Sequence, residues 1–346
     1  MSRLNPLWTA GRLNEALANA SDDARLELGP DGRIEVVEAH LKSSPGLQKQ
    51  APAMTREMRG RVFVEPMTGS YEFDTGFRKL PPFLAFLSIN PEPWCSTMIA
   101  SGALELIGPF MDYPNPLWEW LVRAARADRV RIFPFQGLSS FLRHSRRESS
   151  LDKRDIPLPD LVHDKLSGSP AWLRSTLDDF EFSRILTNVE SAADATAVAA
   201  GLMEMHDLAE SHELAQSVEG RGQHRAGDYW HAIHHRREPD PSNAKYWLRK
   251  VGSHPIHTML ATASRSFLSA SVISDRATER DVSFEKLAPN GVWDPFAFVD
   301  LCTRAIEDKD FELAWAARQL QFLEMTLLLD SAHDDATTSG VPAGQR

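Results

Sequence analysis

Residues 227–252 read GDYWHAIHHRREPDPSNAKYWLRKVG, and this stretch predicts two helices joined by a tight corner. No helix breaker precedes Pro239, which ends the first helix because the residue before a proline is pushed out of the α region. Asp240 can cap a second helix that begins at Pro241, where the missing N–H costs no hydrogen bond. Gly252 is the matching signal for the end of that helix.

Four polar side chains fall on one face of the first of these helices. Asp228, His231, His235 and Glu238 are spaced by three, four and three residues, which places them in one stripe. Two histidines at i and i+4 can share a metal ion, and a carboxylate one turn further on can be a ligand, an outer partner or a general base. His234 falls outside the stripe, so we expect it to be incidental.

The preceding segment, residues 192–219, predicts one uninterrupted helix, because it lacks proline and its apolar residues recur at spacings of three and four. His212 lies on the apolar stripe of this helix and therefore needs a hydrogen-bond partner or a ligand. If the loop at residues 220–227 folds the two helices into an antiparallel pair, His212 can reach His231 or His235. These three histidines are the candidate metal ligands.

One hypothesis is that the protein is an enzyme or binds a small molecule, and that its cofactor is a divalent transition metal such as zinc or iron. In it, His235 and Glu238 are the candidate acid/base residues. Arg236, Arg237 and Lys245 could bind an anionic substrate, and ion pairs with neighbouring acids are their alternative role. The sequence indicates neither the substrate nor the type of reaction.

A second hypothesis is a non-enzymatic helical scaffold or interaction protein. The same histidines and Glu238 would then form a structural hydrogen-bond network that holds the helical corner, and function would lie on an outer surface. The partner would be another protein rather than a small molecule.

Composition excludes several other classes of function. The chain has 346 residues and a formal net charge of −10, which argues against a nucleic-acid or anionic-membrane binder. Cys95 and Cys302 form neither a disulfide framework nor a metal-binding spacing, which fits a reducing compartment. With no run of 18 apolar residues and no signal-peptide pattern at the N-terminus, we expect a cytoplasmic protein without a membrane partner.

The pattern of the whole chain predicts a mainly α protein. Residues 151–330 are expected to form an all-helical domain, either a bundle or a helical-hairpin array, after a smaller mixed α/β region at residues 1–150. The tail at residues 331–346 has little to bury and is expected to be disordered.

Within these regions the expected elements are shorter segments bounded by turn signals. In the first region we expect a hairpin over 24–39, a strand pair from 61–65 and 70–74, helices at 83–89, 97–111 and 117–127, and a strand or link at 129–135. In the second we expect helices at 158–166, 170–187, 192–219, 228–237, 241–251, 255–271, 294–307 and 311–329.

Two motifs carry a resemblance. The pattern YWHAIxHRREPDxxNAKYW, which begins at Tyr229, and the segment WDPFxFVDLC, which begins at Trp293, resemble those of a widespread set of uncharacterised bacterial proteins. The resemblance covers about residues 195–330 and implies no activity, so it assigns no catalytic role. Its pattern has an apolar residue at the position of His234, which agrees with the helix geometry above.

Overall fold

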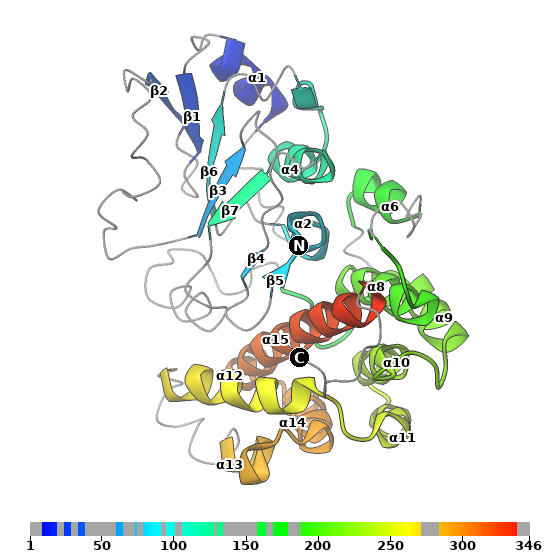
Figure 1. Cartoon of the computed structure of the whole chain (residues 1–346). Coiled ribbons are helices and arrows are strands. Elements are labelled where there is room, and N and C mark those ends of the chain that lie inside the picture. The colour runs from blue at the N-terminus through cyan, green and yellow to red at the C-terminus, as the bar shows by residue number, and fades with distance from the viewer. Residues whose placement is uncertain are drawn as a thin grey trace, which may run out of the picture. The chain divides into compact units, whose positions relative to one another are not determined.

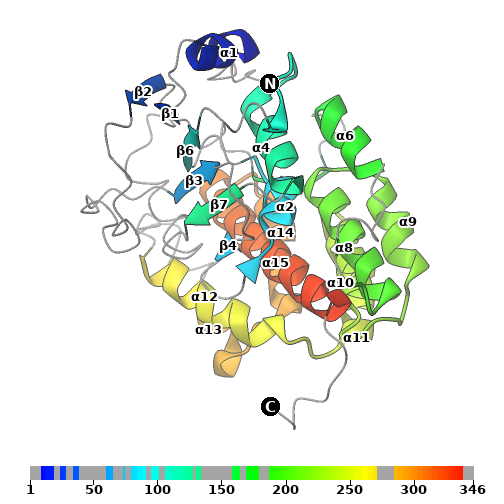
Figure 2. The same cartoon turned by 45° about the horizontal axis from the view of Figure 1, so that its top comes forward.

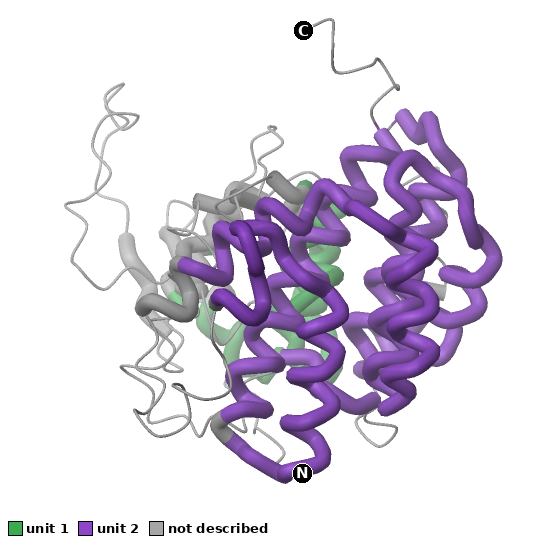
Figure 3. The backbone as a smooth tube through the Cα atoms, turned by 90° about the horizontal axis from the view of Figure 1, so that it is seen from below, with its two compact units in different colours: residues 1–141 green, residues 142–346 purple. Residues whose placement is uncertain are grey.

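The computed structural model of the protein is mainly helical, with a smaller mixed region near the N-terminus, as the sequence predicted (Figure 1). The chain divides into two compact units, Met1–Phe141 and Leu142–Arg346, which are described one at a time (Figure 3). No helix in the described part of the chain combines the length and the apolar character that crossing a membrane requires. The structure describes residues 9–18, 24–28, 34–38, 60–64, 73–74, 79–90, 95–100, 106–127, 130–133, 158–163, 169–178, 186, 188–270 and 284–337.

The first unit contains a five-stranded sheet with the order β2-β1-β6-β3-β7. Neighbouring strands are antiparallel, except that β3 and β6 are parallel. The strands are β1 (Ala24–Leu28), β2 (Ile34–Glu38), β3 (Gly60–Val64), β6 (Cys95–Ala100) and β7 (Val130–Phe133); β4 (Phe73–Asp74) pairs with β5 (Lys79–Leu80). Helices α1 (Ala10–Ala18), α2 (Pro82–Ser88) and α4 (Pro116–Arg126) complete the unit.

Four expectations for this unit were right and two were wrong. The strand or link predicted at 129–135 contains strand β7. The hairpin forms as β1 and β2, and the helices predicted at 83–89 and 117–127 form as α2 and α4. The segment at 61–65 pairs with β6 and β7 instead of with residues 70–74. The first part of the segment predicted as a helix at 97–111 is strand β6, because a short apolar run has the same pattern in a buried strand and in a buried helix.

The second unit is built from helices around α10 (Ala226–Arg237). Every residue of α10 is buried, and the helix contacts α8, α9, α11, α14 and α15 (Figures 1 and 2). The helices are α6 (Ala171–Asp178), α8 (Ala192–Met205), α9 (Glu210–Ser217), α10, α11 (Pro241–Val251), α12 (Ile256–Ala270), α13 (Phe284–Leu287), α14 (Pro295–Glu307) and α15 (Phe311–Thr337), with a 3₁₀ turn at η2 (Pro289–Gly291).

Helix α8 packs closely on α10 because Gly201 has no side chain. A Cβ atom there would lie 2.4 Å from Cζ2 of Trp230, whose side chain is fully buried. The corner after α10 forms as predicted, since the Asp240 side chain accepts a 3.0 Å hydrogen bond from the Asn243 N–H and caps α11. Gly252 ends α11 with a positive φ of 69°, a backbone conformation that glycine adopts without strain.

The helix predicted over 192–219 is instead two helices, α8 and α9, because the chain breaks at residues 206–209. Asp207 has a positive φ of 57°, and its carboxylate pairs with the Arg237 guanidinium. No proline or glycine marks this break, so helical periodicity alone could not indicate it. The break separates α9 from α8, and α9 carries His212 to α10.

The tail predicted to be disordered after Asp330 is helical as far as Thr337, because α15 continues through it. Ala332 and Ala336 are fully buried, and the Ala336 carbonyl accepts hydrogen bonds from the N–H groups of Glu190 and Ser191. Two other predicted helices differ from the structure. Residues 158–163 are not helical, and α6 covers only the first part of 170–187; the rest of both segments lies largely outside the described residues.

Candidate functional site

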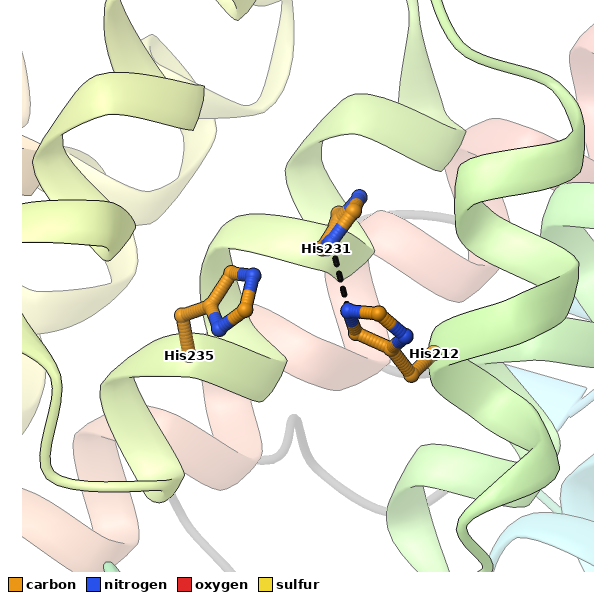
Figure 4. A group of neighbouring side chains, drawn as sticks. All are labelled: His212, His231 and His235. Carbon is orange, nitrogen blue, oxygen red and sulfur yellow. Dashed lines mark hydrogen bonds between the residues drawn. The ribbon is translucent and has the colours of Figure 1, made fainter.

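Three of the predicted site residues meet between α9 and α10 (Figure 4). His231 and His235 lie one turn apart on α10, and His212 reaches them from α9. The Nε2 atoms of His231 and His212 are 2.9 Å apart. One ligand nitrogen from each of these residues, here called the histidine cluster, can be chosen so that all three lie within 4.8 Å of one another.

His231 is the most deeply buried member of the cluster, with 2% of its surface exposed. Its ring stacks on Trp247 of α11 at a centroid distance of 3.9 Å. Burial lowers the pKa of His231 to about 3, and positive charge on His212 and His235 adds to the effect. The imidazole is therefore neutral at physiological pH, and its buried Nδ1 lacks a hydrogen-bond partner within the described structure.

The neighbours of His235 determine which of its ring nitrogens carries the proton. Its Nδ1 lies 3.0 Å from the Glu238 carboxylate, so that Nδ1 carries the proton and donates it. Nε2 is then an acceptor, 3.0 Å from the side-chain amide nitrogen of Asn243. A carboxylate on one ring nitrogen is the usual way in which a metal-binding histidine is oriented, and in His235 the other nitrogen is occupied by Asn243.

His212 lies at the accessible edge of the cluster. Its side chain is partly exposed, and Glu238 nearby is exposed. Desolvation, together with positive charge on His234 and His235, lowers the pKa of His212. His212 is therefore also neutral at physiological pH, and solvent can reach the cluster from this side.

The fourth member of the predicted stripe, Asp228, does not join the cluster. Its carboxylate accepts hydrogen bonds of 3.0 and 3.3 Å from the N–H of Gly220, in the loop before α10. Asp228 therefore holds the loop between α9 and α10 in place.

His234 was expected to be incidental, and this expectation was wrong. Its Nδ1 lies 2.8 Å from a carboxylate oxygen of Glu204, and His163 lies 2.7 Å from the other oxygen. Because α10 is buried on all sides, a side chain outside the predicted stripe also faces protein. The sequence did hold one signal, since Glu204 is a single acid within the apolar run VAAGLMEM and needs a buried partner.

Glu204 is held as a buried carboxylate. Burial by itself raises its pKa, but the ion pair with Arg237 and the hydrogen bonds with His163 and His234 outweigh burial and hold the pKa well below its ordinary value. Arg237 donates at 2.7 Å both to the Glu204 carboxylate and to the Glu204 carbonyl. It also donates at 2.9 Å to the carbonyl of Asp160.

The three candidate substrate-binding residues all lie in ion pairs. Arg237 is fully buried against Glu204, and the buried Arg236 pairs with Glu324 of α15 at 2.6 Å. Lys245 of α11 pairs with Asp300 of α14 at the surface. Ion pairing is thus the role that these side chains have within the protein.

Pockets of about 330 and 520 Å³ lie elsewhere, around α13, η2 and the start of α14, and none of the cluster histidines is among their lining residues. A comparison of the chain with protein-family models, with curated proteins and with solved structures gave no match.

Proposed function

We propose that this protein binds a divalent transition-metal ion, such as zinc or iron, through His212, His231 and His235. The observation that carries the proposal is the convergence of three imidazoles from two helices, with ligand nitrogens within 4.8 Å of one another. Two nitrogens on one tetrahedral zinc ion are about 3.3 Å apart. The 2.9 Å between His212 and His231 comes within a few tenths of an ångström of that spacing.

The chemistry of the donors agrees with this proposal. The lowered pKa values of His212 and His231 keep both imidazoles neutral, which is the form that binds metal. Glu238 orients His235 through Nδ1 and is a positioning residue in this proposal. Asn243, which now donates to Nε2 of His235, would turn its amide away when the ion binds there.

Three histidine ligands are typical of catalytic zinc sites, because they leave one coordination position for water or substrate. A zinc ion held in this way lowers the pKa of bound water to about 7 and supplies hydrolytic or hydration chemistry. The partly exposed His212 and the exposed Glu238 give water a path to the cluster.

The experiment is elemental analysis of untagged protein purified without chelator, alongside a His231→Ala/His235→Ala double variant and a His212→Gln variant. We expect at least one equivalent of a transition metal in the natural protein and one equivalent less in each folded variant. His224→Gln is the matched control, since His224 pairs with Asp335 outside the cluster and its loss should leave the metal content unchanged.

A structural hydrogen-bond network is the second candidate function of these residues. It is favoured by His235, both of whose ring nitrogens already have partners inside the protein. In that case neither the natural protein nor any variant contains metal, and the histidine variants lose only stability. The function of the protein would then lie on its outer surface, as in a helical scaffold.

A further inference from the structure

A second group of ligand atoms lies beside the histidine cluster. His163, which precedes α6, Glu204 of α8 and His234 of α10, here called the Glu204 cluster, place one ligand atom each within 4.8 Å of one another. His163 Nε2 is 2.7 Å from one Glu204 oxygen, and His234 Nδ1 is 2.8 Å from the other. Two ligand atoms bound at about 2.1 Å to one ion at right angles would be about 3.0 Å apart.

The donor set of this second group suits a transition metal. Two imidazoles with one carboxylate form a set that iron and zinc sites use. The segment that carries His163 is fixed, because the His163 N–H donates a 3.1 Å hydrogen bond to the Arg237 carbonyl at the end of α10. Arg237 donates at 2.7 Å to the same Glu204 oxygen that His163 contacts.

The balance of charge leaves room for a divalent cation. Glu204, Asp207 and Glu238 bring three carboxylates to this region, and Arg237 is the one permanently charged cation that pairs with them in the described structure. Glu204 and Arg237 are fully buried and paired with each other, so the remaining negative charge lies on the partly buried Asp207 and the exposed Glu238. A bound cation would compensate that charge.

Glu238 connects the two groups of ligands. One of its oxygens is 3.0 Å from His235 Nδ1, and the other is 3.4 Å from His234 Nε2. The ring of His234 lies 5.0 Å from the ring of His212. The two candidate sites are therefore neighbours, and Glu238 contacts one histidine of each site.

We infer that the Glu204 cluster binds a second divalent transition-metal ion, so that the protein contains a two-metal centre. This inference rests on the proposed function, because the first ion belongs to the histidine cluster. Paired metal ions are common in enzymes that hydrolyse phosphate esters and peptides, where both ions stabilise the attacking and leaving oxygens. Hydrolysis is one reaction class that such a two-metal centre would support.

The test is a titration of the full-length, metal-free protein with cobalt(II), followed by its visible absorption and by elemental analysis after dialysis. We expect two equivalents in the natural protein and in the His224→Gln control. His163→Gln should bind one equivalent with the absorption spectrum of the histidine cluster. His212→Gln should also bind one, with the spectrum of the Glu204 cluster. His163 is the residue to change, because Glu204 and His234 are more deeply buried.

Three outcomes overturn the inference, and together they separate it from the proposed function. One equivalent in the natural protein, unchanged by His163→Gln, would leave the histidine cluster as a single metal site. No bound cobalt in any of these proteins would remove both proposals. Electron paramagnetic resonance is the second measurement, since magnetic coupling between the two ions requires that they be neighbours; two bound ions without coupling would also contradict a two-metal centre.

Discussion

At the level of single residues, His231 should make the stability of the metal-free protein depend on pH. Its pKa is about 3 in the folded protein and about 6.5 in the unfolded chain, so between these values the unfolded state binds the additional proton. Stability is therefore unaffected by this residue above pH 6.5 and falls as the pH drops through that value. The loss at about pH 5 is about 2 kcal/mol.

Urea unfolding in the presence of a chelator, at about pH 7 and about pH 5, measures this loss. The pKa of His234 is shifted in the opposite direction. Burial lowers it, but the hydrogen bond and the charge of Glu204 outweigh burial and raise it. The comparison must therefore be with His231→Gln, which should lose less stability than the natural protein over the same pH interval. Equal losses in the two proteins would contradict the lowered pKa of His231.

Arg237 should contribute far more to stability than Lys245. Arg237→Met leaves the buried Glu204 and the partly buried Asp207 without their cation, which costs about 3–5 kcal/mol. Lys245→Met removes a surface ion pair with Asp300 and should cost less than about 1 kcal/mol. Denaturant unfolding of both variants provides the comparison, and similar losses would mean that the Arg237 network contributes no more than a surface pair.

Sequence periodicity could predict His231 and His235 as neighbours, because spacing on a helix fixes which side chains share a face. It could place His212 beside them only on the assumption that the two helices pack as an antiparallel pair. It could not predict Glu204 or His163, which come from other elements and meet His234 only through tertiary packing. It also set His234 aside, because His234 lies outside the stripe of Asp228, His231, His235 and Glu238, although every face of α10 is buried. In a helix that is buried on all sides, every side chain contacts the rest of the protein.

At the level of elements, α15 should require the residues after Asp330. A chain that ends at Asp330 loses the buried Ala332 and Ala336, together with the ion pair between Asp335 and His224. We expect a loss of roughly 3 kcal/mol or more, because buried contacts and hydrogen bonds disappear together. A chain that ends at Thr337 is the control, since it retains all of these contacts. Equal thermal midpoints for the two truncated proteins would contradict this role.

The elements themselves were predictable where local signals were strong. The proline and aspartate at the start of α11 and the glycine after it fix that helix to within a residue. The break between α8 and α9 and the continuation of α15 were not predictable, because long-range contacts of Asp207 and Ala336 stabilise them. Polar residues such as those after Asp330 predict disorder only when nothing packs against them.

At the level of the whole molecule, residues 142–346 should fold and bind metal without residues 1–141. The chain divides into two compact units at this point, and every ligand of both proposed sites lies between His163 and Glu238. The large buried side chains Trp230 and Trp293 belong to the same unit, which is long enough to bury a core of its own.

The shorter chain should therefore show the near-ultraviolet circular dichroism of fixed tryptophans and unfold cooperatively. It should also bind as much cobalt as the full chain, because both proposed sites lie within residues 142–346. His231→Ala/His235→Ala in the shorter chain is the matched control and should reduce cobalt binding without loss of the tryptophan signal. A shorter chain that keeps its far-ultraviolet helical signal but lacks the near-ultraviolet signal would be a collapsed state without fixed packing. That result would show that the first unit is needed to order the helices around α10, and the metal ligands could then not be assigned to the second unit alone.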